Sequence, residues 1–153
     1  MIPNLLIAKF GYLVGGDYIN KLPLNYLNSV WADSFPVGDV YEEDADRMLA
    51  CSLQAMQFVK DKLFIVYDFS LEYTLTGIQR NQTIVRLVST FAAYYLAKRD
   101  DSVSKDLLES YDASMKDIGD YMVKNISIAN LPSAPSEYKS KSYVYDGSSK
   151  YFY

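Results

Sequence analysis

Three long amphipathic stretches between residues 41 and 124 constrain the fold of this chain more than any other feature. Their apolar side chains recur at steps of three and four, the period of an α-helix with one buried face. We predict helices at about 41–64, 81–99 and 103–124. The side chains expected to face inward are Ala45, Met48, Leu49, Ser52, Met56, Val59 and Leu63 in the first, Ile84, Leu87, Val88, Phe91, Ala92 and Tyr95 in the second, and Val103, Leu107, Tyr111, Met115, Ile118 and Met122 in the third.

The connection between the second and third stretches is very short. Asp100, Asp101 and Ser102 form a tight joint, in which Ser102 is the expected cap of the third helix. Such a joint makes the two helices antiparallel neighbours. Two shorter helices are predicted nearer the N-terminus, one ended by Gly15-Gly16 and one at about 23–32. The predicted fold class is therefore mainly α, an antiparallel helical bundle.

An excursion at about 65–80 interrupts the helical pattern. It is rich in β-branched and aromatic residues, which favour a β-hairpin or an extended loop. An isolated hairpin is only marginally stable in water, so the excursion is expected to pack against another surface. We predict that Tyr67, Phe69 and Tyr73 contact a partner.

The composition changes again after Leu131. Residues 132–153 contain no Leu, Ile or Met but six aromatic residues, which is more than a solvated tail needs. We therefore predict a helical domain over 1–131 and an extended C-terminal arm over 132–153 that binds a partner. The aromatic residues of the arm are Tyr138, Tyr143, Tyr145, Tyr151, Phe152 and Tyr153.

Composition also excludes several kinds of chemistry. The chain has no histidine, which removes Ser-His and Cys-His nucleophile pairs and every His-ligated metal site. The lone Cys51 cannot form an internal disulfide and is expected to be a buried, inert thiol. A net charge of −4 without a basic cluster argues against a protein that grips DNA. We expect no enzyme activity, cofactor, metal or membrane span.

Four local patterns have structural explanations that outweigh a functional one. The acidic cluster at 42–46 suits the positive end of a helix better than a cation site. Gly15-Gly16 lacks the rest of a phosphate-binding loop. Tyr94-Tyr95 resembles a base-stacking platform, but helical periodicity places Tyr95 in the core. Ser102 and Lys105 have the spacing of a Ser-Lys pair at a helix start, where capping is expected.

Five segments carry a resemblance to a known family. They are residues 4–11 (NLLIAKFG), 44–50 (DADRMLA), 95–99 (YLAKR), 111–118 (YDASMKDI) and 126–132 (ISIANLP). Their order and spacing over about two-thirds of the chain resemble those of tailed-phage head–tail connector proteins, the Mu-like small helical adaptors. The long connection at 17–39, the excursion and the aromatic arm depart from that pattern. The high Tyr, Asn, Lys and Ser content is similar to that of proteins from crAss-like phages.

The resemblance implies a structural virion protein. Such subunits form a ring, commonly twelvefold, between the portal protein and the next neck or tail protein, and DNA passes through the channel without specific binding. The chain would be assembled in the bacterial host cytoplasm and reside at the head–tail interface. The alternatives are a tail-completion or stopper neck protein, or a small cellular adaptor or regulatory helical domain. An enzyme ranks behind these and would need a metal or catalytic carboxylates at 42–46.

Overall fold

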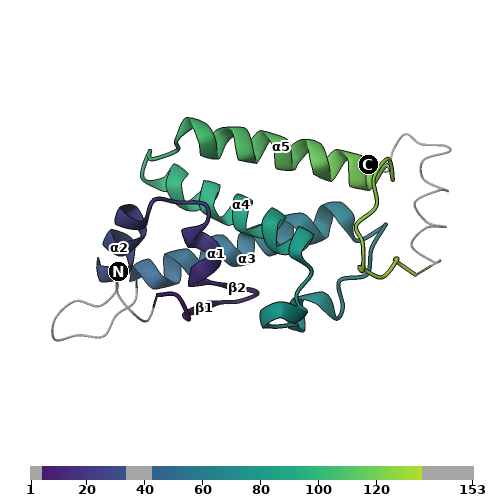
Figure 1. Ribbon diagram of the computed structural model, residues 1–153, viewed down its shortest axis with the longest axis horizontal. Helices are drawn as coiled ribbons and strands as arrows, with labels where there is room; N and C mark the ends of the chain where they lie inside the picture. The colour runs from purple at the N-terminus through teal and green to yellow at the C-terminus, as the bar shows by residue number, and fades with distance from the viewer. Residues whose placement is uncertain (1–4, 34–42, 136–153) are drawn as a thin grey trace.

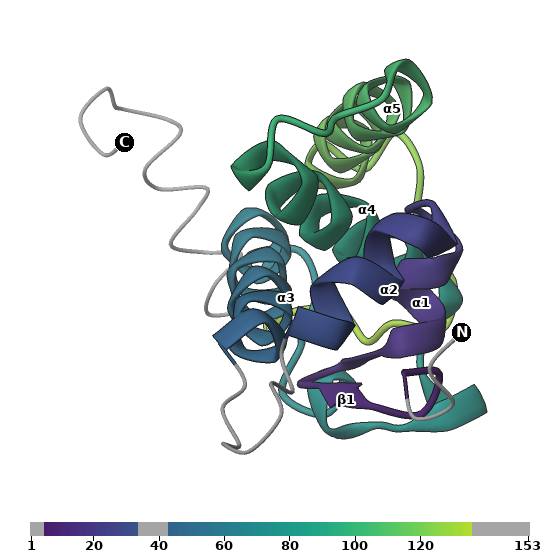
Figure 2. The ribbon, with the colours of Figure 1, turned by 90° about the vertical axis from the view of Figure 1, so that its left-hand side faces the viewer.

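Three long helices form the body of the molecule, and the computed structural model describes residues 5–33 and 43–135. Helices α3 (Glu43–Leu63), α4 (Gln82–Arg99) and α5 (Lys105–Met122) run antiparallel in chain order (Figure 1). The three predicted long helices and the mainly α fold class are thereby confirmed. Seen along the helix axes, α3 and α5 lie on two sides of α4 (Figure 2). Most side chains of α4 from Ile84 to Ala97 are buried.

Side-chain caps define the N-termini of α4 and α5. The Asn81 side-chain oxygen accepts hydrogen bonds from the N–H groups of Thr83 and Ile84, 3.0 and 3.3 Å away. Ser104 caps α5, because its hydroxyl accepts from the Leu107 N–H at 3.1 Å. The predicted cap at Ser102 is therefore wrong by two residues. Asp101 adopts a left-handed backbone with φ of 54°, which lengthens the joint before the helix can begin.

The N-terminal segment differs from the predicted helix. It forms an antiparallel hairpin of β1 (Lys9–Phe10) and β2 (Leu13–Val14), and helix α1 (Gly15–Ile19) begins where the predicted helix should have ended. Gly11 turns the hairpin with a φ of +71°, a conformation that glycine adopts without strain. Gly15 donates its N–H to the Ala8 carbonyl at 2.9 Å, which fastens the segment before the hairpin to α1.

The second short helix agrees with prediction, and the elements within residues 5–33 cover one side of α4. Helix α2 (Leu24–Asp33) corresponds to the stretch predicted at 23–32. Helix α1 and strand β2 contact α4, while β1 contacts α3 (Figure 2). The core is continuous from Leu5 and Phe10 through α4 to α5. The side of α4 between α3 and α5 is left without this N-terminal cover.

Of the two predicted alternatives for the excursion, a β-hairpin or an extended loop, the structure shows the extended loop. Residues 64–81 contain two short 3₁₀ turns, η1 (Glu72–Thr74) and η2 (Gly77–Gln79), and no hairpin. One isolated β-bridge pairs Tyr67 with Ser133. The loop packs on the body through buried side chains rather than by strand pairing.

The body also extends further than the predicted boundary at residue 131. The Asp68 N–H donates to the Pro132 carbonyl at 2.8 Å, and the Ala134 N–H donates to the Val66 carbonyl at 2.9 Å. Ala134 is buried. The first residues of the predicted arm therefore belong to the body, and residues 136–153 lie outside the described part of the chain.

Candidate interaction groove

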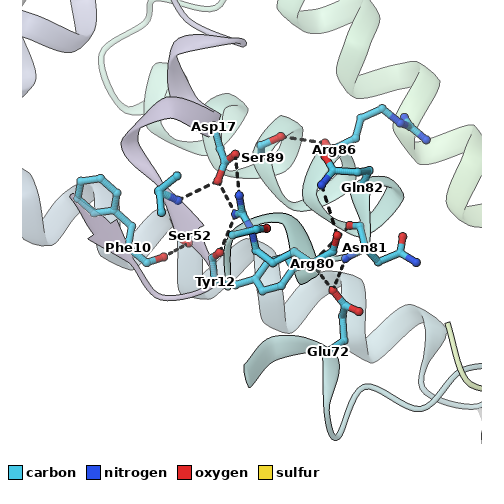
Figure 3. A network of polar contacts seen from close by, with 12 residues as sticks. Phe10, Tyr12, Asp17, Ser52, Glu72, Arg80, Asn81, Gln82, Arg86 and Ser89 are labelled. Atoms are coloured by element: carbon cyan, nitrogen blue, oxygen red, sulfur yellow. Dashed lines mark hydrogen bonds and ion pairs between the residues drawn. The ribbon is translucent and has the colours of Figure 1, made fainter. Parts of the chain in front are cut away.

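A cluster of polar side chains joins the hairpin, the excursion and the start of α4 (Figure 3). Glu72 is buried and accepts hydrogen bonds from the Tyr12 hydroxyl and from the Asn81 N–H, the latter at 2.7 Å. Arg80 forms an ion pair with Asp17 at 2.7 Å and donates to the Tyr12 carbonyl at 3.0 Å. A buried carboxylate beside a phenol and an arginine is a combination that also occurs in active sites.

The hydrogen-bond and ion-pair partners of these groups indicate a structural role for the cluster. Burial, followed by the hydrogen bond to Glu72, raises the pKa of Tyr12, so this phenol stays protonated over the physiological range. The carboxylate of Glu72 is satisfied by two donors, and the Arg80 charge is matched by Asp17. A buried charge without such a partner would be strongly destabilising. The cluster therefore fastens the excursion to the hairpin, and it presents no activated nucleophile.

A second feature is a series of aromatic rings that crosses the three long helices. Phe58 of α3 meets Phe91 of α4 with ring centroids 5.0 Å apart, and Phe91 meets Tyr111 of α5 at 5.6 Å. Tyr111 in turn stacks on Tyr94 at 4.0 Å with an interplanar angle of 21°. Edge-to-face and stacked pairs of this kind stabilise beyond their buried area. The series reaches the surface at Tyr94 and Tyr111, which are only half-buried.

A shallow hollow of about 350 Å³ lies at this exposed end of the ring series. It is lined by side chains from all three long helices: Gln54, Tyr94, Tyr95, Lys98, Arg99 and Tyr111. The Lys98 ammonium lies 5.7 Å from the centroid of the Tyr94 ring. Burial, followed by the nearby Tyr111, raises the pKa of Tyr95, so its hydroxyl remains a hydrogen-bond donor. The hollow thus offers aromatic faces, hydroxyls and two exposed cations.

Apolar side chains continue this surface along α5. Leu108, Met115 and Met122 are 43%, 38% and 44% exposed. Leu108 and Met115 are three residues before and four residues after Tyr111, so they share its face of the helix. The prediction that Met115 and Met122 point into the core is wrong. Ser114, Ile118 and Tyr121 fill the buried face of α5. Met115 and Met122 each follow one of these buried residues, so their side chains lie nearer the surface.

We call this surface the aromatic groove: the hollow between α3 and α5 together with the exposed strip of Leu108, Met115 and Met122. Tyrosine, methionine and arginine are enriched at the centres of protein interfaces, where they combine large contact area with hydrogen bonding. A contiguous exposed apolar patch marks an interaction site more often than an isolated apolar residue does. The groove therefore suits a peptide segment with bulky apolar side chains.

The predicted partner contacts of the excursion need correction. Tyr67 and Phe69 are buried in the chain's own core, and Tyr73 is packed against it. Phe69 contacts the Tyr73 ring at 5.2 Å, and the Tyr73 hydroxyl donates to the Met56 carbonyl at 2.7 Å. Burial raises the pKa of Tyr73. These rings hold the excursion on the body and are not available as a partner surface.

Replacing Phe69 by serine is accordingly expected to destabilise the monomer. Removal of a buried aromatic ring costs about 3 kcal/mol or more, since it loses apolar burial and leaves a cavity. Urea unfolding followed by circular dichroism measures the effect. Leu71→Ser is the matched control, because Leu71 is exposed in the same loop. Equal unfolding midpoints for the two variants would contradict the assignment of Phe69 to the core.

Other sequence patterns have simpler outcomes. Cys51 is buried as predicted, and burial raises the pKa of its thiol. Tyr95 packs against the core as predicted, and both Tyr94 and Tyr95 line the groove. The side chains of the acidic cluster at 42–46 and the six aromatic residues of the arm lie outside the described part of the chain. The sequence shows Leu108, Met115 and Met122 at heptad spacing but not that these side chains are exposed, so the groove was not predicted.

Comparisons with known proteins do not extend this assignment. No family model, curated protein or solved structure matches the chain. Among the side chains that the structure describes, those of residues 5–30 and 47–135, no acidic and cysteine groups gather as a metal site requires. None of the helices within residues 5–33 and 43–135 combines the length and apolar character needed to cross a bilayer. The fold and the groove therefore define the chain as a mainly helical protein with a candidate protein-binding surface.

Proposed function

We propose that this chain is a structural subunit of a tailed-phage neck, a head–tail connector that assembles into a ring beneath the portal protein. The observation that carries the proposal is the aromatic groove, an exposed apolar surface on a rigid helical body. A subunit of a ring needs such a surface, because each copy must contact its neighbour through two different faces. The tyrosine-rich composition of residues 136–153 adds a second surface of the interface type.

The resemblance to the connector family supports the same function through the position of its segments. The stretch at 95–99 lies at the end of α4, where Tyr95, Lys98 and Arg99 line the groove. The stretch at 111–118 places Tyr111 and Met115 beside it. Two of the five family-like segments thus meet at one surface of the body. In the proposed ring this surface serves contacts between proteins, and the channel carries DNA without specific binding.

Deleting residues 136–153 tests the proposal. We expect the shortened chain to keep its helical signal and its melting temperature, because the hydrogen bonds of Pro132 and Ala134 to the excursion are retained. Assembly into rings, with or without the portal protein of the same virus, should be lost. Light scattering and electron microscopy measure assembly, and circular dichroism measures folding.

The control for chain length is a full-length variant. In it, the six aromatic residues of the arm are replaced by serine. It should behave as the shortened chain does if the rings provide the contact. A shortened chain that still forms rings would remove the proposed role of the arm. A full-length chain that stays monomeric and ignores the portal protein would instead favour a cellular adaptor or regulatory domain.

A further inference from the structure

The aromatic groove is open along its length in the described structure. The side chains of Leu108, Met115 and Met122 are each more than a third exposed, and Tyr94 and Tyr111 are half-buried. Three apolar side chains in line along one helix, beside a hollow with aromatic walls, form a strip rather than scattered residues. An extended peptide with large side chains at intervals covers a strip of this shape better than a flat surface would.

Residues 136–153 have the composition for such a contact. They contain six aromatic rings and no Leu, Ile or Met, so their apolar surface is almost entirely aromatic. Aromatic rings pack favourably against methionine sulfur and against other rings. The segment has three lysines and two acidic residues, a net charge of +1. Helix α5 has a net charge of −3, but Glu109, Asp117 and Asp120 are already ion-paired, and the hollow itself carries Lys98 and Arg99. Packing of aromatic rings against the apolar strip, rather than charge, therefore favours this segment.

The point at which the chain leaves the body gives the segment ample reach. Ala134 is bonded to Val66, three residues after the end of α3. Eighteen residues span at most about 60 Å when extended. Helix α3, with 21 residues, is about 31 Å long. If fully extended, the segment would be about twice as long as α3 and would reach a neighbouring molecule.

We propose that the aromatic groove of one copy binds residues 136–153 of a second copy. This inference rests on the proposed function, because it supplies the contact between ring neighbours. Each copy would donate one segment and receive another, which is the heterologous arrangement that a ring requires. The segment also tethers two bodies, so weak contacts elsewhere between them would be strengthened by their high local concentration.

Photo-crosslinking in the full-length chain tests this contact. Met115 is replaced by p-benzoylphenylalanine, and isotopically heavy and light copies are mixed before assembly and irradiation. Mass spectrometry then identifies the peptide joined to residue 115. We expect adducts with peptides from 136–153, with heavy and light copies joined at the frequency of random mixing. The matched control carries the same probe at Ala113, an exposed residue on the outer face of α5, and should give few such adducts.

The outcomes separate this inference from the proposed function. Light scattering of the same samples reports assembly independently of crosslinking. Adducts confined to one copy, or adducts with another part of the second copy, would overturn the inference while rings persist. Samples that never assemble would overturn the proposed function and the inference together. A probe at Ala113 that captures the segment as well as the probe at 115 would show that the groove is not its site.

Discussion

Replacing Gly15 by alanine is expected to destabilise the chain by about 3 kcal/mol, the upper part of the range for overpacking a filled site. A Cβ atom at this position would lie 1.6 Å from the Leu5 carbonyl oxygen, so the backbone itself would have to move. That movement would break the hydrogen bond from the Gly15 N–H to Ala8, which fastens α1 to the segment before the hairpin. For a chain of this size we expect the melting temperature to fall by roughly 6–12 °C.

The neighbouring glycine provides the control. A Cβ atom at Gly16 would meet the Leu6 carbonyl oxygen at 3.8 Å, an ordinary contact distance. Gly16→Ala should therefore change the melting temperature little, by about 0.5 kcal/mol or less in stability. Thermal unfolding followed by circular dichroism compares the two variants. If Gly15→Ala were as stable as Gly16→Ala, the close approach of α1 to Leu5 would be wrong.

Met115→Glu is expected to have the largest effect on assembly. The substitution puts a carboxylate into the apolar strip of the aromatic groove, where a partner would remove it from water. Burying a charge without a partner costs at least about 2 kcal/mol, which weakens each contact on the order of 30-fold. Because Met115 is already exposed in the monomer, the free energy of unfolding should change by only about 0.5 kcal/mol.

Ala113→Glu is the matched control, since it adds the same charge to an exposed position on the outer face of α5. Assembly is measured by light scattering over a range of protein concentrations, and stability by urea unfolding. We expect the assembly midpoint to shift for the residue 115 variant alone. An equal shift for both variants would mean that the added negative charge, and not the groove, is responsible.

The long helices could be predicted because their apolar spacing has only one structural solution. Three-to-four spacing over about twenty residues fits an amphipathic helix and no strand. The N-terminal segment has no such length. Leu5 is buried in the segment before the hairpin, and Phe10 and Leu13 are buried in the hairpin itself, although their spacing is equally compatible with one helix face. The left-handed turn at Gly11 favours the hairpin over the helix. A glycine inside an apolar run was the only sequence signal of that turn.

The interaction surfaces were harder to predict, for a related reason. Composition shows that an aromatic side chain will be buried but not which molecule will cover it. Phe69 has the residue type of an interface yet lies in the chain's own core, whereas Met115 has core spacing yet lies on the surface. The choice depends on how α5 is rotated against α4, which is set by packing between helices. No local pattern encodes that rotation.

The attachment of residues 132–134 to the excursion has a mechanical consequence. A pull on residue 136 would first load the two main-chain hydrogen bonds at Val66 and Asp68, and through them the end of α3. The Tyr67 hydroxyl, which accepts from the Ile128 N–H at 2.9 Å, shares that load from the other side. Tension on residue 136 would therefore pass to the end of α3 before it could unfold residues 123–131, which connect α5 to this attachment.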